Sequence, residues 1–181
     1  MPLIVTLHGY DILVDWTSKY GVRHFKQYEV IVRKVLTYAD AIIVASNAVR
    51  QETLKLCKCY DKIYLIPNGV DVLRFNPNLD GSKIRHRLGI HSEFVIFTVR
   101  HHEPKYGIEY LIRAIPLVLK KRDDVRFIIG GDGLLRRYHE KLARKLGVDR
   151  YVIFTGTIPM AELPFYYVAS DVVVVPSLQE A

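Results

Sequence analysis

Two permanent cations stand close together in the segment "TVRHHEPKYG", shortly before a stretch with the periodicity of a helix. Arg100 and Lys105 keep their positive charge throughout the physiological pH range. The N-terminus of a helix adds unpaired backbone N–H groups, so such a loop can hold a phosphate or diphosphate without a metal ion. The alternative is that both side chains are ordinary solvated cations of a loop.

Other polar or glycine-containing loops follow other apolar runs of the sequence. Glycines let a ligand approach the backbone closely, although "GGDG" (Gly130–Gly133) is also explained by an ordinary turn between a strand and a helix. A histidine or carboxylate in such a loop can hydrogen-bond a hydroxyl group of a ligand. Besides the two cations, the candidate residues are His8, Gly131, Asp132, Gly133, Gly156, Thr157, Ile158 and Glu180.

The elements that must position these loops alternate between strands and helices. Short apolar runs predict strands at "PLIVTL", "AIIVAS", "KIYLIP", "FVIFTV", "VRFIIG", "YVIFTG" and "DVVVV", the last as a buried strand. Amphipathic spacing predicts helices over about 22–39, 48–57, 82–88, 108–121 and 134–146, and another from about 164. Such alternation indicates parallel sheets, in which ligands bind beyond the carboxyl ends of the strands. All the polar loops fall at those ends.

A turn-rich segment, residues 70–91, interrupts this alternation. We therefore predict an α/β protein with two parallel-sheet lobes, residues 1–69 and residues 92–181, joined by this connector. The strands before the connector should form one sheet and those after it another. A single sheet joining "AIIVAS" to "FVIFTV" would contradict the two-lobe organisation.

Composition and charge limit the classes of protein to which the chain can belong. The 181 residues carry a formal net charge of +7, which favours anionic partners. No apolar run approaches the ~20 residues that span a bilayer, and the N-terminus lacks the basic region of a signal peptide. Cys57 and Cys59 lack the second pair that a zinc site needs, and no other cluster has metal-ligand spacing. We expect a cytoplasmic protein with reduced thiols and no metal.

Several segments, in order along the chain, resemble one known family. "PLIVTLHG", "ADAIIVASNAVRQET", "IPNGVDVLRFNP", "GGDGLL" and "VIFTGTIPMAELPFYYVASDVVVVPSLQEA" resemble retaining glycosyltransferases of the GT-B fold, family 4 (glycosyl transferases group 1). The resemblance implies two Rossmann-like lobes, both incomplete: the C-terminal part of the acceptor-side lobe (1–69) and the N-terminal part of the nucleotide-sugar donor lobe (92–181). The family's glycine-rich first loop and second glutamate have no counterpart here, so we expect a fragment truncated at both ends.

The resemblance also implies roles for the candidate residues. Arg100 and Lys105 would hold the donor diphosphate, Glu180 would contact the donor sugar, and His8 would lie at the reaction centre. The loops 131–133 and 156–158 would contact the nucleotide. An alternative for His8 is packing against the tight turn at the following glycine.

The match at the diphosphate loop is imperfect. The family's lysine usually adjoins the glycine, whereas here Tyr106 stands between Lys105 and Gly107. Counting back from the glycine places His101 and Tyr106 at the family positions instead. We favour Arg100 and Lys105 because only they carry permanent charge, so Lys105→Ala should cost more activity than Tyr106→Ala.

The implied reaction moves a sugar from a nucleoside diphosphate sugar to a sugar or lipid-linked acceptor with retention of configuration. The nucleotide sugar is then a co-substrate, and no cofactor is expected. Peripheral membrane contact would use the basic amphipathic helix over 22–39. Nucleic acid is not expected, because the basic residues are dispersed and those of helix 134–146 form a solvated face. We expect no activity from the isolated chain. The alternative is a non-catalytic nucleotide-binding remnant or a partner-dependent fragment.

Overall fold

The computed structural model describes residues 1–16 and 20–178. The chain divides into two compact units, one spanning Met1–Val70 and one beginning at Asp71. Each unit contains its own parallel sheet, three-stranded in the first and four-stranded in the second. The predictions of an α/β protein and of two separate parallel sheets are therefore confirmed.

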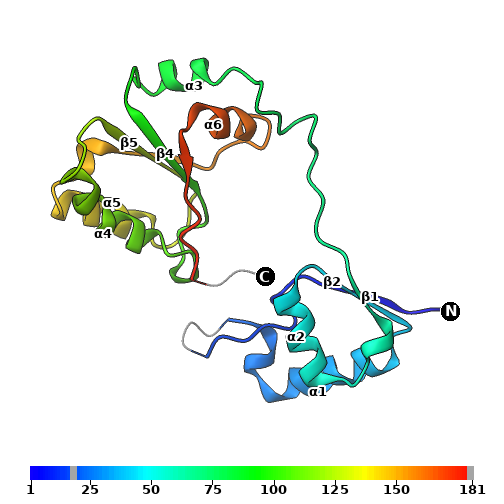
Figure 1. The fold of residues 1–181 in the computed structure, drawn as a ribbon. Helices are drawn as coiled ribbons and strands as arrows, with labels where there is room; N and C mark the ends of the chain where they lie inside the picture. The colour runs from blue at the N-terminus through cyan, green and yellow to red at the C-terminus, as the bar shows by residue number, and fades with distance from the viewer. Residues whose placement is uncertain (17–19, 179–181) are drawn as a thin grey trace. The chain divides into compact units, whose positions relative to one another are not determined.

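The first unit contains a sheet of order β1-β2-β3 with two α-helices and two short 3-10 turns (Figure 1). The core lies around β2, where Ile42 and Val44 are fully buried against residues of the helices such as Leu36 and Val49. The elements in chain order are β1 (Ile4–Leu7), η1 (Val22–His24), α1 (Lys26–Tyr38), β2 (Ala41–Val44), α2 (Asn47–Leu56), η2 (Tyr60–Lys62) and β3 (Ile63–Leu65).

The predicted helix over residues 22–39 is divided in two. The 3-10 turn η1 ends at His24, the backbone of Phe25 is extended (φ −99°, ψ 119°), and α1 begins at Lys26. The Phe25 ring packs edge-on against His24 on one side and Tyr28 on the other. The apolar spacing continues across Phe25, so it did not reveal a single residue with extended backbone.

Cys57 and Cys59 are joined by a disulfide in the structure. The expectation of two reduced thiols is therefore wrong for this structure. The helix α2 ends at Leu56, Cys57 follows it in an extended conformation, and the Cα atoms of the two cysteines lie 5.3 Å apart.

The second unit has the sheet order β6-β5-β4-β7, with every pair of strands parallel. Helices lie on both faces of this sheet. Its elements in chain order are α3 (Ser82–Arg87), β4 (Phe94–Val99), η3 (Pro104–Tyr106), α4 (Ile108–Leu119), β5 (Val125–Gly130), α5 (Arg136–Lys145), η4 (Asp149–Tyr151), β6 (Val152–Gly156), α6 (Leu163–Ala169) and β7 (Val172–Val173).

Alternate residues of the central strands face two different cores. Phe127 and Ile129 of β5 pack with residues of α4 and α5, whereas Ile128 packs with Phe97 of β4 and with α3 and α6. Figure 1 shows α4 and α5 on one side of the sheet and α6 on the other. Both faces are apolar because both are covered, which explains the unbroken apolar runs of the sequence.

The segment 70–91 contains α3, which packs on α6 of the second unit. Ile84 of α3 belongs to the buried core that α3 shares with α6. Arg85 donates to the carbonyl oxygen of Ala169 (2.9 Å) and to the carboxylate of Asp171 (2.9 Å). These contacts hold the segment against the sheet.

The final strand differs from its prediction as a buried strand. β7 contains only Val172 and Val173, whose side chains are 42% and 43% exposed. It lies at the edge of the sheet beside β4. An apolar run cannot by itself distinguish a central strand from such an edge strand. Across the described residues, none of the helices combines the length and apolarity of a bilayer span.

Phe97→Ala should destabilise the second unit by about 3–5 kcal/mol. Phe97 is fully buried, and its ring centroid lies 5.7 Å from that of Tyr166 and 5.4 Å from that of Tyr167. Urea unfolding followed by circular dichroism measures the loss. Phe165→Ala on α6, where the side chain is 36% exposed, is the matched control and should cost about 1 kcal/mol or less. Equal losses in the two variants would contradict the core position of Phe97.

Candidate functional site

A pocket of about 270 Å³ lies where β4, β5 and β6 end. Its walls come from the loops that follow these strands, at the carboxyl edge where parallel sheets bind ligands. The structure brings together five of the residues predicted from sequence, which are Arg100, Gly131, Asp132, Thr157 and Ile158. The remaining lining residues are Val99, His101 and Tyr106.

Backbone hydrogen bonds continue between the loops beyond the ends of the strands. The N–H of Arg100 donates to the carbonyl oxygen of Gly130 (3.2 Å), and that of His102 donates to Asp132 (2.9 Å). On the other side, the N–H of Gly131 donates to the carbonyl oxygen of Gly156 (2.7 Å). The three loops therefore hold one another in a fixed arrangement.

Gly131 permits the closest of these approaches. Its φ is +102°, and a Cβ at this position would lie 2.0 Å from the carbonyl oxygen of Arg100. No other residue fits such a place without moving the loop. The glycines of "GGDG" thus have a structural explanation, and the same close packing places Asp132 in the pocket wall.

Arg100 is half-buried, and hydrogen bonds orient its side chain. Its Nε donates to Oγ of Ser177 (3.2 Å), and its Nη1 donates to the carbonyl oxygen of Val99 (3.3 Å). Ser177 belongs to the loop that follows β7. The same loop is fastened a second time, because the N–H of Leu178 donates to the carbonyl oxygen of Lys105 (2.8 Å).

The side chain of Lys105 is not among those that line the pocket. Its Nζ lies 4.8 Å from the centroid of the Tyr106 ring and 3.8 Å from Oε2 of Glu103. Tyr106 and His101 do line the pocket, with their ring centroids 6.0 Å apart. The pocket therefore combines Arg100 from one of the two alignments considered above with His101 and Tyr106 from the other.

The remaining predicted residues lie elsewhere or border the pocket. Gly133 packs on the backbone of His102, and Gly156 ends β6 with φ +74°. His8 is exposed at the end of β1, in the first unit. The carboxylate of Asp11 accepts the backbone N–H of His8 (3.2 Å), so Asp11 shapes this turn. Glu180 lies outside the described residues.

Arg136 was assigned from sequence to a solvated basic face, and that assignment is wrong. Its side chain is only 19% exposed. Its guanidinium donates to the carbonyl oxygens of Gly131 and Phe154, both at 3.3 Å, and to Glu140 at 2.7 Å. Arg136 thereby joins the loop after β5 to β6. The sequence signal for these contacts was the position of Arg136 in the first helical turn after "GGDG".

Sequence analysis also missed a buried histidine pair beneath these loops. His102 and His139 are 0% and 1% exposed, and their Nδ1 atoms lie 2.9 Å apart. Burial lowers the pKa of both rings, and for His102, with neighbouring His139 and Arg136 adding to the effect, it lowers the pKa to about 4. Both rings are therefore neutral near pH 7. His139 falls on the apolar stripe of its helix, between Leu135 and Leu142, which was the signal for burial.

Within the described ranges, no three His, Cys, Asp or Glu side chains come together as a possible metal site. The pocket lining itself offers a half-buried guanidinium, a carboxylate, aromatic rings and closely packed backbone loops.

Comparison with known proteins decides the family. Residues 80–181 match the family model of glycosyl transferases group 1, and residues 1–74 match that of glycosyltransferase family 4. The chain belongs to the glycosyl transferases group 1 family. The pocket lies wholly within the region that matches this family.

Relatives of this glycosyltransferase family align with almost the whole chain. An uncharacterized glycosyltransferase of Methanocaldococcus jannaschii is 34% identical, over 99% of this chain and 47% of its own length. A GDP-mannose-dependent phosphatidylinositol monomannoside mannosyltransferase of Mycolicibacterium smegmatis is 27% identical, over 96% of this chain and 44% of its own length. The chain thus spans about half the length of the curated relatives it matches.

Among solved structures, Anabaena HepE in complex with UDP is similar in fold, with a TM-score of 0.81 and 25% identity. The similarity covers 98% of this chain and 47% of HepE. The two parallel sheets therefore belong to the GT-B fold implied by the sequence resemblance.

The His102–His139 pair should make the second unit less stable in acid. The pKa of His102 is about 4 in the folded chain, whereas an unperturbed histidine has a pKa of about 6.5, so in mild acid the unfolded chain binds a proton that the folded chain does not. This stabilisation is present above about pH 6.5 and is lost as the pH falls toward 4. We expect about 2 kcal/mol less stability at pH 5 than at pH 7.5 from this source.

Urea unfolding at the two pH values measures this difference. The double variant His102→Leu/His139→Leu isolates the pair from the other histidines, because it removes both titrating rings together. An unchanged pH dependence in the double variant would refute the assignment.

Proposed function

We propose that this chain carries the nucleotide-sugar donor site of a retaining glycosyltransferase. In that reaction, a sugar moves from a nucleoside diphosphate to a sugar or lipid-linked acceptor. The observation that carries the proposal is the pocket of about 270 Å³ at the carboxyl ends of β4, β5 and β6, within the segment that matches the group 1 family.

The Arg100 wall of the pocket suits a diphosphate. Its guanidinium is a permanent cation, and the bonds to Ser177 and to the Val99 carbonyl fix its direction. A preoriented cation stabilises the charge that develops on the leaving diphosphate without reorganising during the reaction. The adjacent loop leads into the N-terminus of α4 after Gly107, which favours the same charge.

The part of the pocket that comes from the loop after β6 suits a nucleobase. Thr157 and Ile158 line it, and Ile158 also packs against Gly130, where an added Cβ would lie 2.6 Å from its Cδ1. Such a fixed apolar side chain offers a surface for one face of a base. HepE binds UDP and the mycobacterial relative is GDP-mannose-dependent. Both nucleotides therefore belong in a binding test.

The remaining parts of the reaction are assigned by resemblance. We place His8 at the reaction centre and Glu180 on the donor sugar. For a lipid-linked acceptor, α1 supports contact with an anionic membrane. It exposes Val30 (55%), Ile31 (54%) and Tyr38 (77%), and it carries Lys26 and Lys34 on exposed positions.

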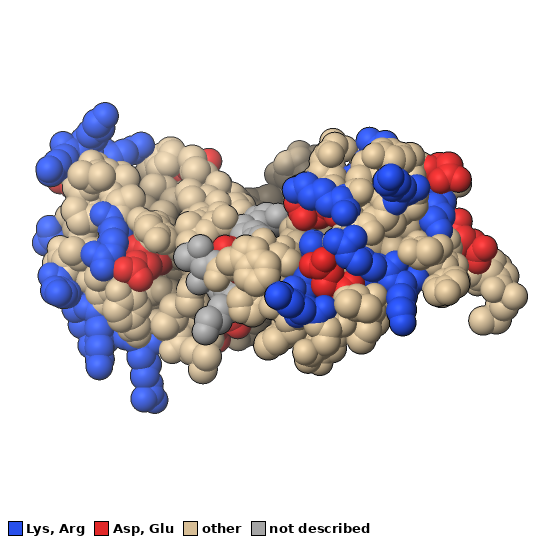
Figure 2. Space-filling view, turned by 90° about the horizontal axis from the view of Figure 1, so that it is seen from below, with Lys and Arg blue, Asp and Glu red and all other residues tan. Residues whose placement is uncertain are grey.

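Nucleic acid is not the anionic partner that we propose. On the face seen in Figure 2, Lys and Arg side chains are spread out and separated by acidic and uncharged surface. Binding of a nucleic-acid backbone favours a basic stripe or patch.

Arg100→Ala should weaken the binding of UDP or GDP about 10- to 100-fold, because a charge-assisted hydrogen bond contributes about 1.5–3 kcal/mol. Isothermal titration of each nucleotide into the purified chain gives the dissociation constants. Arg122→Ala is the matched control, since Arg122 pairs with Asp124 at the opposite end of the sheet. Equal affinity in the unmodified chain and Arg100→Ala would show that this pocket does not hold the diphosphate.

Substitutions of Lys105 and Tyr106 test which of these two side chains contributes to nucleotide binding. Because Tyr106 lines the pocket and Lys105 does not, we now expect Tyr106→Ala to weaken nucleotide binding more than Lys105→Ala. This reverses the expectation drawn from charge alone. The same titration decides between them, and a larger effect of Lys105→Ala would favour the original assignment.

We further propose that the chain by itself binds nucleotide without measurable sugar transfer. Its span of about half the length of its curated relatives supports this. The alternative is a non-catalytic nucleotide-binding remnant or a partner-dependent fragment. A turnover assay with a panel of nucleotide sugars, run beside the titration on one preparation, tests it. Robust transfer by the isolated chain would overturn the proposal.

A further inference from the structure

The backbone of His102 is fastened to the "GGDG" loop on two sides. Its N–H donates to the carbonyl oxygen of Asp132, and its carbonyl oxygen accepts the N–H of Leu135, both at 2.9 Å. Between these bonds, Gly133 lies so close that an added Cβ would be 2.9 Å from both the nitrogen and the oxygen of His102. His102 is thus the residue at which the loop after β4 is held to the loop after β5.

The side chain of His102 points away from the pocket lining and into the protein, where it meets His139 of α5. A separation of 2.9 Å between two ring nitrogens requires one to donate and the other to accept. Among the described residues, Nε2 of His102 is buried without a partner. An unpaired buried acceptor is less costly than an unpaired N–H, so we assign the donated proton to Nδ1 of His102.

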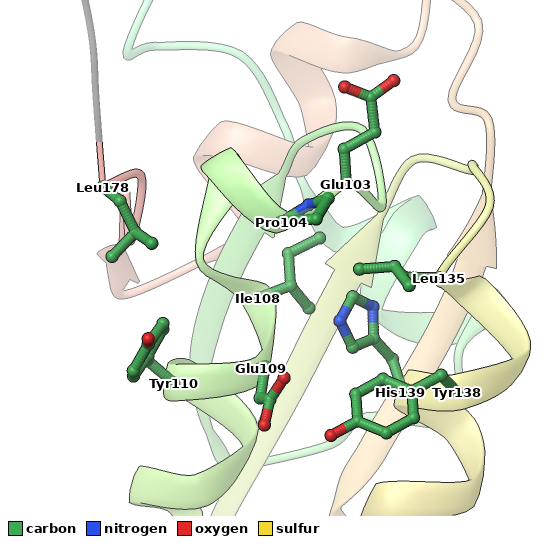
Figure 3. Close-up of a pocket in the computed structure, with 9 residues that line it drawn as sticks. All are labelled: Glu103, Pro104, Ile108, Glu109, Tyr110, Leu135, Tyr138, His139 and Leu178. Atoms are coloured by element: carbon green, nitrogen blue, oxygen red, sulfur yellow. The ribbon is translucent and has the colours of Figure 1, made fainter. Parts of the chain in front are cut away.

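His139 therefore accepts through Nδ1, and its own proton lies on Nε2. Its ring lines a second cavity, of about 330 Å³, on the other side of the same loop. In Figure 3 the ring lies between Leu135 and Tyr138 and faces Ile108 of α4. The His139 ring is almost fully buried beside this cavity, so removing the ring would extend the cavity toward His102.

We infer that His139 is a positioning residue for the candidate donor site. Nδ1 of His139 accepts a hydrogen bond from Nδ1 of His102 and so fixes the segment Arg100–His102 against "GGDG". This positions the backbone of Arg100 and of Asp132, two residues that line the pocket. The inference rests on the proposed function, because it assigns a role in nucleotide binding. Loss of the hydrogen bond should loosen the two loops while the sheet beneath them stays intact.

Two variants of similar size separate this role from simple packing. His139→Leu fills the space but cannot accept a hydrogen bond, whereas the amide oxygen of His139→Gln can accept one from Nδ1 of His102. In His139→Leu, hydrogen exchange at the amides of His102 and Leu135 should become about tenfold faster, with exchange in the centre of β5 unchanged. His139→Gln should restore slow exchange. Lys141→Leu, on the exposed face of the same helix, is the control for the substitution itself.

Nucleotide affinity is the second measurement. The dissociation constant for UDP or GDP should rise about tenfold in His139→Leu and return toward the unmodified value in His139→Gln. In His139→Ala, added imidazole should enter the cavity, replace the missing ring and restore slow exchange at Leu135. Dimethylimidazolium, which carries no acceptor nitrogen because both ring nitrogens are methylated, should not.

The outcomes separate this inference from the proposed function. If the unmodified chain binds neither nucleotide, the proposed function fails for this chain, yet the exchange rates still decide whether His139 holds the loops. Unchanged exchange at His102 and Leu135 in His139→Leu overturns the inference, even if the nucleotide binds. Equal effects of leucine and glutamine on both measurements would also overturn it, because they would indicate packing alone.

Discussion

The candidate site depends on the close approach of two backbone segments at the carboxyl edge of the second sheet. A Cβ on Gly131 would lie 2.0 Å from the carbonyl oxygen of Arg100, and only a glycine with positive φ fits there. Beyond the strands, three backbone hydrogen bonds from Arg100, Gly131 and His102 keep the loops in register. If these segments separated, Arg100 and Asp132 would no longer share one pocket wall.

The layers beneath make this approach possible. β4 and β5 are parallel along six paired residues, and α4 and α5 cover one face of their sheet while α3 and α6 cover the other. Parallel strands that are packed on both faces end at the same edge of the sheet, so packing alone brings the loops that follow them together. The partly buried guanidinium of Arg136 then joins the loop after β5 to β6, and the pair formed by His102 and His139 fixes the loop after β4. Polar contacts therefore refine an arrangement that apolar packing establishes.

The apolar spacing of the sequence predicted helices and strands well where one face of the element is buried. It was less reliable where a contact distant in sequence decided the outcome. Among the described residues, the valines of β7 pair with β4 on one side and remain 42% and 43% exposed. Arg136 was expected in solvent, but its guanidinium meets carbonyl oxygens from two strand ends.

The sequence by itself determined the α/β class, the division into two sheets, the family resemblance and five of the residues that line the pocket. Periodicity and short motifs are local properties of the sequence, so they can be recognised without knowledge of long-range contacts. Only the tertiary structure decided that Tyr106 rather than Lys105 lines the pocket, and that His102 meets His139. Both outcomes depend on side-chain direction and on distances between residues far apart in the chain. A linear pattern contains neither, because folding sets them through packing.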